Sequence, residues 1–286
     1  MTTQEGQRRN PALATTWEAS DPVLLKRIMP LVEYLEIPPD SIAASDGRRA
    51  HLRSDALDGI AGAASNVQTI VHGIGLSIAS FDRWNDSYLE LLDEYFDRVT
   101  PEWHSEHLGY TTVAGENIGT MLAPDRTGEM LDLVCERIAR LQSRYRVPFL
   151  VENIVNMLPC DEFPYTQAGF LNTITSRTGC GLLLDVRNLE CDAKNSGVDI
   201  HAFLDELDLR AVREMHVAGG TSYQGFEMDV HSRPASDSTL ALAIDVMALA
   251  PNLEVVTYEF MKEANPALTH GGLCAELRRI RTAISQ

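Results

Sequence analysis

Short apolar runs alternate along the chain with longer stretches whose apolar residues recur every three or four positions. The runs are rich in β-branched and aromatic residues and predict strands at 31–37, 67–73, 102–110, 148–154, 181–189, 212–219, 228–234 and 253–260. The longer stretches predict helices at 87–99, 129–145, 170–178, 202–212 and 275–284, the third of them ending before Gly179. Eight strands alternating with helices indicate an α/β protein with a parallel sheet, and eight is the number that closes a (β/α)8 TIM barrel.

The same pattern sets the expected domain organisation. Residues 1–20 are polar and predict an N-terminal tail, and residues 21–286 predict a single barrel domain. A doubly wound open sheet is the competing topology. The first predicted strand is not followed by GxGxxG, and the chain has no P-loop, so nothing favours the nucleotide-binding version of that sheet.

Charge and cysteine content narrow the environment and the partners. The formal net charge of −17 disfavours nucleic acid and anionic membranes as partners, because an acidic surface repels phosphate groups. No run is long and apolar enough to cross a bilayer, and the first residues lack the apolar stretch of a secretory signal. Five cysteines without a CxxC pair indicate free thiols in a reducing compartment, so we expect a cytoplasmic protein.

Polar side chains of one chemical kind stand at the ends of the predicted strands, directly after apolar residues. In a barrel the carboxyl ends of all strands share one rim, so these side chains are expected to meet in one pocket. They are His72, His107, Glu152, Asn153, Asp185, His216, Asp229, His231 and Glu259.

Four carboxylates and four imidazoles at one rim need compensating positive charge, because an unpaired buried carboxylate is costly. In these segments Arg187 and Arg233 supply little of it, and bound metal cations are the simplest source. Imidazole and carboxylate ligands without thiolate suit iron, zinc or manganese. A lone histidine is more often structural or exposed. That interpretation is kept for the four remaining histidines, His51, His104, His201 and His270.

The order of the ligands along the strands suggests how they divide among metals. A carboxylate on a middle strand can bridge two ions, and Glu152 occupies such a position. We expect one metal at His72, His107 and Glu152, and a second at Glu152, Asp185, His216 and Glu259. A third ion could lie at Asn188, Asp229 and His231.

Several short motifs follow one another in a specific order. They are HGIGLS at 72–77, SEHLGY at 105–110, VEN at 151–153, LLDVRN at 183–188, NSG at 195–197, HVAG at 216–219, DVHSRP at 229–234 and TYE at 257–259. From about Leu31 to the C-terminus the chain resembles the multinuclear non-heme iron-dependent oxidases, which have a xylose-isomerase-like barrel. Two positions depart from the pattern. Many members have two Asn where this chain has Arg187 and Asn188, and a His where Ser196 stands.

The resemblance implies two or three irons, with a mixed Fe(II)/Fe(III) pair as the active form, and O2 as co-substrate. It implies oxidation of a side chain, usually cysteine, in a ribosomally made precursor peptide. It also implies a small partner protein that recognises the leader peptide. On this basis Glu152 and Asp185 are the expected catalytic residues, and Asn153 and Arg233 the expected substrate contacts.

Three other functions fit a metal-binding barrel. A hydrolase of the apurinic-endonuclease type carries similar ligands, but DNA binding needs a basic groove. A sugar isomerase of the xylose isomerase type would normally need a catalytic lysine and a site richer in carboxylates than this one. A non-enzymatic metal-binding or peptide-binding protein would not need so many ligands around open coordination positions.

Overall fold

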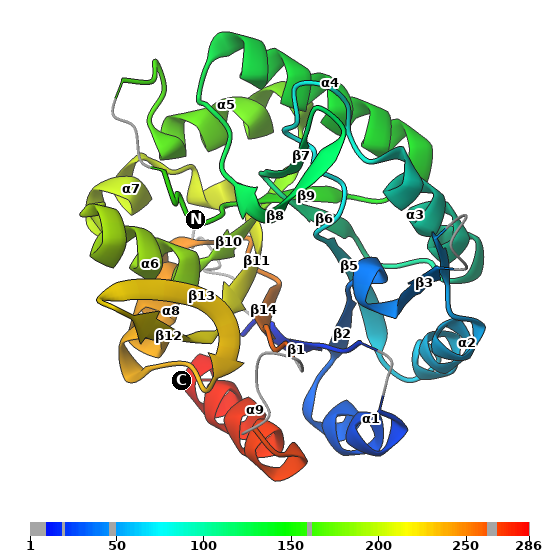
Figure 1. The fold of residues 1–286 in the computed structure, drawn as a ribbon. Coiled ribbons are helices and arrows are strands. Elements are labelled where there is room, and N and C mark those ends of the chain that lie inside the picture. The colour runs from blue at the N-terminus through cyan, green and yellow to red at the C-terminus, as the bar shows by residue number, and fades with distance from the viewer. Residues whose placement is uncertain (1–9, 19–20, 46–49, 159–161, 262–267, 286) are drawn as a thin grey trace, which may run out of the picture.

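The computed structural model describes residues 10–18, 21–45, 50–158, 162–261 and 268–285. Eight parallel strands form a closed barrel and follow one another around it in chain order, with the last strand pairing the first. Figure 1 shows the view along the barrel, with the helices surrounding it. The barrel strands are β1 (Ala12–Thr16), β2 (Tyr34–Ile37), β5 (Gln68–Gly73), β6 (His104–His107), β9 (Phe149–Glu152), β10 (Gly181–Asp185), β11 (Val212–Val217) and β14 (Val255–Tyr258). The predicted (β/α)8 barrel is therefore confirmed.

Helices connect the strands and cover the outside of the barrel. They are α1 (Pro22–Ile28), α2 (Ser54–Ala63), α3 (Asp86–Arg98), α4 (Gly128–Tyr145), α5 (Gln167–Thr178), α6 (Val186–Ser196), α7 (Ile200–Glu206), α8 (Asp237–Leu249) and α9 (His270–Ile284). Three short 3-10 turns lie at Met29–Leu31, Pro39–Ile42 and Leu209–Ala211. Helix α5 ends as predicted at Gly179, whose φ of 69° is the left-handed conformation that glycine adopts readily. No helix among the described residues is long and apolar enough to cross a membrane.

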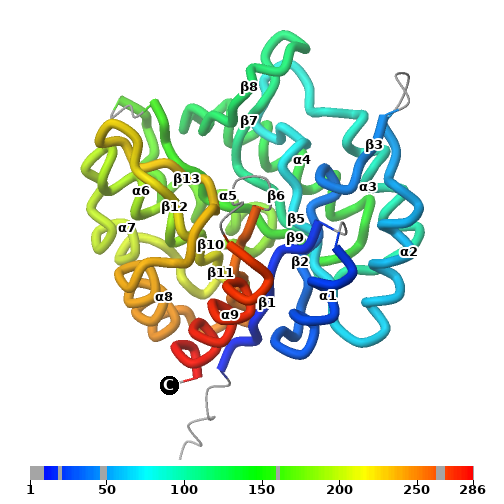
Figure 2. The backbone as a smooth tube through the Cα atoms, turned by 60° about the horizontal axis from the view of Figure 1, so that its bottom comes forward, coloured from blue at the N-terminus to red at the C-terminus, as the bar shows by residue number. Residues whose placement is uncertain are grey.

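Three antiparallel hairpins stand apart from the barrel sheet. They are β3 (Ala43–Ser45) with β4 (Ala50–Leu52), β7 (Tyr110–Val113) with β8 (Glu116–Leu122), and β12 (Gly219–Tyr223) with β13 (Phe226–Arg233). In Figure 2 the β7–β8 hairpin projects at the end of the barrel opposite the C-terminus. The last two hairpins directly follow β6 and β11, so they extend from the carboxyl-terminal rim.

Three sequence-based expectations are wrong in detail. Residues 12–16 belong to barrel strand β1 rather than to a polar tail over 1–20, of which 1–9 and 19–20 lie outside the described residues. The run 228–234, predicted as the seventh barrel strand, falls mainly in hairpin strand β13 and does not belong to the barrel. The strand predicted at 181–189 stops at Asp185, because that residue caps helix α6.

Side chains inside the barrel form layers, because residues two apart on a strand point to the same side. Near the amino-terminal end the interior is filled by a cluster of buried apolar side chains. Its members are Ala14, Ile70, Trp103, Leu150, Leu183 and Val255. Two positions further along their strands stand Thr16, His72, Ser105, Glu152, Asp185 and Thr257. The polar layer therefore consists of the next inward-facing residues on the same strands, closer to their carboxyl ends.

The cysteines lie away from these inward positions. Cys135, Cys180, Cys191 and Cys274 are buried and free, and Cys160 lies outside the described residues.

Candidate metal centre

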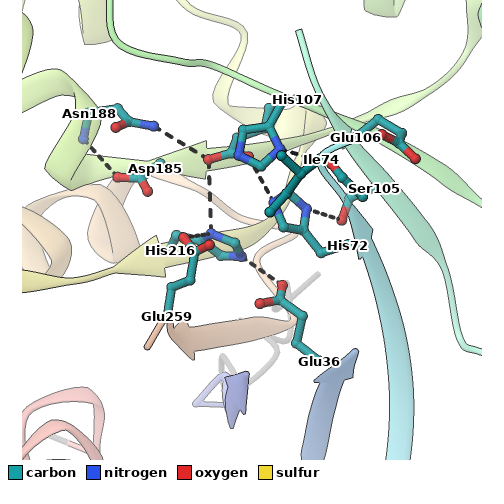
Figure 3. Close-up of polar contacts among 12 residues, drawn as sticks. Glu36, His72, Ile74, Ser105, Glu106, His107, Asp185, Asn188, His216 and Glu259 are labelled. Carbon is teal, nitrogen blue, oxygen red and sulfur yellow. Dashed lines mark hydrogen bonds and ion pairs between the residues drawn. The ribbon is translucent and has the colours of Figure 1, made fainter. Parts of the chain in front are cut away.

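A first group of ligands comes from three neighbouring strands, β5, β6 and β9. The Nε2 atoms of His72 and His107 lie 3.2 Å and 3.3 Å from Oε2 of Glu152. Glu152 is completely buried and His72 is nearly so. Figure 3 shows both imidazole rings turned into the barrel. These three side chains could hold one metal ion, as their positions in the sequence suggested.

Hydrogen bonds fix the direction of both rings. Ser105 donates its hydroxyl to the Val71 carbonyl at 3.2 Å, so it can accept the Nδ1 proton of His72 at 2.9 Å. His107 donates from Nδ1 to the Gly73 carbonyl at 2.8 Å. A neutral imidazole carries one proton, so the Nε2 lone pairs of both rings point toward Glu152.

A second group shares Glu152 with the first. It comprises Glu152, Asp185, His216 and Glu259, whose ligand atoms all lie within 4.8 Å of one another. Nδ1 of His216 lies 2.9 Å from Oε2 of Glu259 and 3.9 Å from Oε1 of Glu152. All four residues are buried, with at most 3% of their surface exposed. The structure thus places Glu152 in both groups, which is the arrangement a bridging carboxylate requires.

Asp185 is held rigidly by its neighbours. Its backbone N–H donates to Oδ1 of Asn153 at 2.9 Å, and its carbonyl accepts from Nδ2 of Asn153 at 3.0 Å. As the N-cap of α6, Asp185 also accepts the Asn188 N–H on Oδ1 at 2.8 Å. Oδ2 has no hydrogen-bond partner among the described residues and is free to bind a ligand. The Asn153 amide, predicted to contact substrate, is committed to positioning Asp185.

The residues predicted to bind a third ion are only partly brought together. His231 approaches Asp229 through Nε2 at 2.6 Å and Glu259 through Nδ1 at 3.3 Å. The Asn188 amide donates to the Asn153 carbonyl at 3.1 Å, and its Oδ1 has no hydrogen-bond partner among the described residues. Asp229 and His231 fall in none of the compact ligand groups found there. The third ion therefore stays a prediction.

Hairpin β12–β13, which carries Asp229 and His231, is anchored to α6. Arg187 is buried and donates from Nη2 to Glu227 at 2.6 Å. The Asn195 amide accepts the Glu227 N–H at 2.8 Å and donates to the Glu227 carbonyl at 2.9 Å. His231 has a φ of 41°, a conformation that costs energy for a residue with a side chain. Arg187, which stands in a segment where many of the similar oxidases have two Asn, thus helps to hold this hairpin in place.

The electrostatics of the two groups differ from those of exposed side chains. Burial raises the pKa of Glu152 to about 7, although His107 and His216 act in the opposite direction. Burial, together with the carboxylates of Asp229 and Glu152, raises the pKa of Asp185 well above its usual range. Burial lowers the pKa values of His72 and His107.

His216, His231 and Glu259 are shifted by one another. Burial disfavours the charged forms, but Glu36 and Glu259 raise the pKa of His216 well above its usual range. In the same way Asp229 and Glu259 raise the pKa of His231. The two histidines hold the pKa of Glu259 well below its usual range against the effect of burial.

The donor atoms fit a metal centre. Nε2 of His72, Oε2 of Glu152 and Oδ2 of Asp185 are buried and have no hydrogen-bond partner among the described residues. Leaving such atoms without a partner is costly, and a bound cation would satisfy them. Because the ligands are nitrogen and oxygen atoms without sulfur, iron, zinc and manganese are the metals that they suit.

A cleft of about 290 Å³ leads to the centre. Its floor includes His107, Glu259 and His231, and its walls are mostly apolar. The apolar lining consists of Ile74, Met121, Ile154, Val155, Met157, Phe226, Met228 and Met261. Arg233, the second predicted substrate contact, is exposed and is not among the residues that line this cleft.

Sequence reasoning missed two buried carboxylates beneath the centre. Glu36 lies 2.8 Å from Nε2 of His216, and Glu214 lies 3.7 Å from the same atom. The available signal was their spacing from inward-facing residues. Glu36 stands two residues after Tyr34 on β2, and Glu214 stands two residues before His216 on β11. Of the histidines predicted to be structural or exposed, His104 is buried against Glu106 and His270 contacts Asp21. His51 and His201 are exposed.

The fold is a (β/α)8 barrel, and the carboxyl ends of its strands carry groups of side chains that could hold metal ions. The model of a protein family described as "RiPP precursor modification enzyme MbnB/TglH/ChrH" matches residues 17–284. The chain belongs to this family, whose members modify precursors of ribosomally synthesised and post-translationally modified peptides (RiPPs). The resemblance found in the sequence motifs is thereby confirmed.

Individual relatives agree with this assignment. A UPF0276 protein of Caulobacter vibrioides (strain NA1000 / CB15N) is 32% identical over 213 residues, covering 74% of each chain. One of Rhizorhabdus wittichii is 36% identical over 172 residues, covering 60% of this chain and 62% of its own length.

Solved structures support the fold. The zinc-bound IOLI protein has a TM-score of 0.62 at 12% identity, over 96% of this chain and 97% of the other. D-psicose 3-epimerase from Clostridium cellulolyticum H10 has a TM-score of 0.60 at 12% identity, over 96% and 98%. At such low identity these likenesses concern the barrel alone.

Proposed function

We propose that the protein is a multinuclear non-heme iron-dependent oxidase that uses O2 to modify a cysteine residue of a ribosomally made precursor peptide. The observation that carries this proposal is the position of Glu152. Its carboxylate faces the Nε2 atoms of His72 and His107 with one oxygen and the His216 side with the other. Two metal ions sharing this carboxylate would lie close enough to hold substrate and oxidant side by side.

Each part of the chain has a distinct task in the proposed reaction. His72, His107 and Glu152 would hold one iron, and Glu152, Asp185, His216 and Glu259 the other. Bound iron would supply the redox chemistry and the activation of O2. The apolar walls of the cleft would admit a peptide side chain and exclude water from the centre. Asn188, Asp229 and His231 are the candidates for a third iron.

Two features favour a peptide substrate. The family to which the chain belongs modifies peptide precursors. The cleft is flanked by exposed apolar side chains, Met157 and Phe226, that a bound polypeptide would cover. We propose that a small protein binding the leader peptide delivers the substrate to this cleft.

The first experiment measures metal content and oxygen consumption. Protein purified without oxygen should contain two or three irons per chain and show the spectroscopic signature of a mixed-valent pair. With a cysteine-bearing precursor peptide encoded beside the gene, it should consume O2 and change the mass of the peptide. Zinc alone, with no iron-dependent oxygen uptake, would overturn the proposal.

A matched pair of variants tests the shared carboxylate. Glu152→Gln should lose metal from both groups, because a neutral amide cannot bridge two cations. Glu276→Gln changes a buried carboxylate of α9 that accepts hydrogen bonds from the Ala235 N–H and the Arg279 guanidinium, away from the site. It should keep the full metal content. Full metal content in Glu152→Gln would refute the bridging role.

A further inference from the structure

His216 is enclosed between carboxylates on both of its ring nitrogens. Nδ1 lies 2.9 Å from Glu259 on the cleft side, and Nε2 lies 2.8 Å from Glu36 on the side of the barrel interior. Figure 3 shows His216 between these two side chains. His216 and Glu36 are completely buried, so water cannot replace either contact. The direction of the His216 ring is therefore set by protein groups alone.

Glu36 is itself fixed in place. Its Oε1 accepts a hydrogen bond from the Thr16 hydroxyl at 2.9 Å, and its Oε2 faces His216. Thr16 lies on β1 directly opposite Glu36 in the register of the parallel β1–β2 pair. Both carboxylate oxygens therefore have partners supplied by adjacent barrel strands, which leaves the Glu36 side chain little freedom to turn.

The nearby Glu214 cannot take over this role. Its Oε1 accepts the Thr257 hydroxyl at 2.5 Å, and its Oε2 accepts the Trp103 indole N–H at 2.7 Å. At 3.7 Å its distance to Nε2 of His216 exceeds that of a good hydrogen bond. Glu36, Glu214 and His216 have the spacing of a ligand group, but every carboxylate oxygen is already engaged. This cluster therefore supports the centre above it and is not a separate metal site.

We propose that Glu36 is a positioning residue that makes His216 a metal ligand through Nδ1. A neutral imidazole that donates Nε2–H to Glu36 has its lone pair on Nδ1, which faces Glu152 and Glu259. His72 and His107 are held the opposite way, with Nε2 turned to the site. A carboxylate behind a ligating histidine makes the ring a stronger donor, and losing such a partner weakens metal binding about 10- to 100-fold. This inference rests on the proposed metal centre but not on iron or O2 chemistry.

The test uses the full chain loaded with zinc, which is diamagnetic. Long-range ¹H–¹⁵N correlation of the histidine rings reports which nitrogen carries the proton, and the His216 signal is identified by its loss in His216→Gln. Wild type should show His216 protonated at Nε2 and metal-bound at Nδ1. Glu36→Leu should lose this pattern and bind zinc about 10- to 100-fold more weakly in chelator competition.

Glu36→Gln and Glu214→Gln form the decisive pair, because both neutralise a buried carboxylate of the barrel interior near Nε2 of His216. The amide oxygen introduced by Glu36→Gln can still accept Nε2–H, so the protonation pattern should persist. Zinc affinity should fall, because the negative charge behind the ring is lost. Glu214→Gln should leave the His216 signal unchanged and should lower the zinc affinity less than Glu36→Gln does, because Glu214 lies farther from Nε2 of His216 than Glu36 does.

The possible outcomes separate this inference from the proposed function. Zinc bound through Nε2 of His216, or equal zinc affinity in Glu36→Gln and Glu214→Gln, would overturn the role of Glu36 while the oxidase proposal stood. This comparison decides the matter even where Glu36→Leu fails to fold. If the zinc experiments give the expected results but the iron-loaded protein takes up no oxygen, the oxidase proposal is overturned and the role of Glu36 stands. A wild type that binds no metal would overturn both.

Discussion

At the scale of single residues, the orientation of each imidazole depends on a partner behind the ring. For His72 that partner is Ser105, a buried hydroxyl with one proton to donate. Because Ser105 gives this proton to the Val71 carbonyl, it must accept from Nδ1 of His72. Alanine at this position would leave a buried N–H without a partner, at a cost of about 1–3 kcal/mol.

Ser105→Ala should therefore weaken metal binding at His72, His107 and Glu152 by about 10- to 100-fold, because the His72 ring is no longer held with Nε2 toward the site. Chelator competition on the purified protein measures the change. Ser80→Ala is the matched control, since Ser80 is also buried and donates to a backbone carbonyl, that of Thr112. Equal affinity in the two variants would show that Ser105 does not orient the ring.

Along each strand, side chains point alternately into and out of the barrel, and this alternation explains which site residues the sequence could reveal. His72, Glu152 and Asp185 stand where an apolar strand ends in a polar side chain, and this pattern is visible without a structure. Glu36 is followed by an apolar residue within its strand, so it could be mistaken for an outward-facing position. Only its place two residues after inward-facing Tyr34 distinguishes it, and that requires knowing the strand's register.

At the scale of elements, strand β1 closes the barrel between β14 and β2. Its sequence, ALATT, has a single large apolar residue and was therefore predicted to belong to a tail. Parallel pairing on both sides supplies the stability that its own composition does not indicate. At 228–234 the opposite happened. The sequence correctly predicted a strand, but strand propensity does not distinguish a strand of a hairpin from a strand of the barrel.

Leu13 is the side chain by which β1 packs against the core outside the barrel, and it is completely buried. Leu13→Ala should destabilise the protein by about 2–5 kcal/mol, through lost burial and the cavity left behind. Urea unfolding measures the loss. Leu249→Ala serves as the control, because Leu249 is 54% exposed and should cost little. A Leu13→Ala variant as stable as the control would mean that β1 does not contribute to the fold.

At the scale of the whole molecule, the chain combines a net charge of −17 with a barrel interior rich in carboxylates. Glu36, Glu152, Asp185 and Glu259 are buried within a few ångströms of His216 or of one another. Without metal, such a cluster favours protonated forms, because burial and neighbouring carboxylates raise the pKa of Asp185 and neighbouring carboxylates raise that of His216. Metal and protons therefore compete for the same atoms, and stability, metal content and pH are linked.

Above pH 7 the raised pKa values in the cluster set the direction in which stability changes with pH. His72 and His107, whose pKa values are lowered, are neutral in both folded and unfolded chains there and contribute no slope. His216 and His231 have raised pKa values, so above pH 7 the folded metal-free protein holds protons that the unfolded chain has released. Its stability should therefore fall as pH rises from 7 to 8.5, while its metal affinity should increase, because metal binding displaces these protons.

Zinc at about one hundred times its Kd should stabilise the protein by about 2.7 kcal/mol, which raises Tm by roughly 4–5 °C for a chain of this size. At one fixed zinc concentration the rise should be larger at pH 8.5 than at pH 7, because affinity is higher there. Calorimetry with zinc and with chelator at both pH values measures it. Glu276→Gln should behave as wild type, and Glu152→Gln should lose most of the zinc-dependent rise. A Tm increase independent of pH, or a metal-free protein that becomes more stable toward pH 8.5, would show that the buried cluster holds no exchangeable protons.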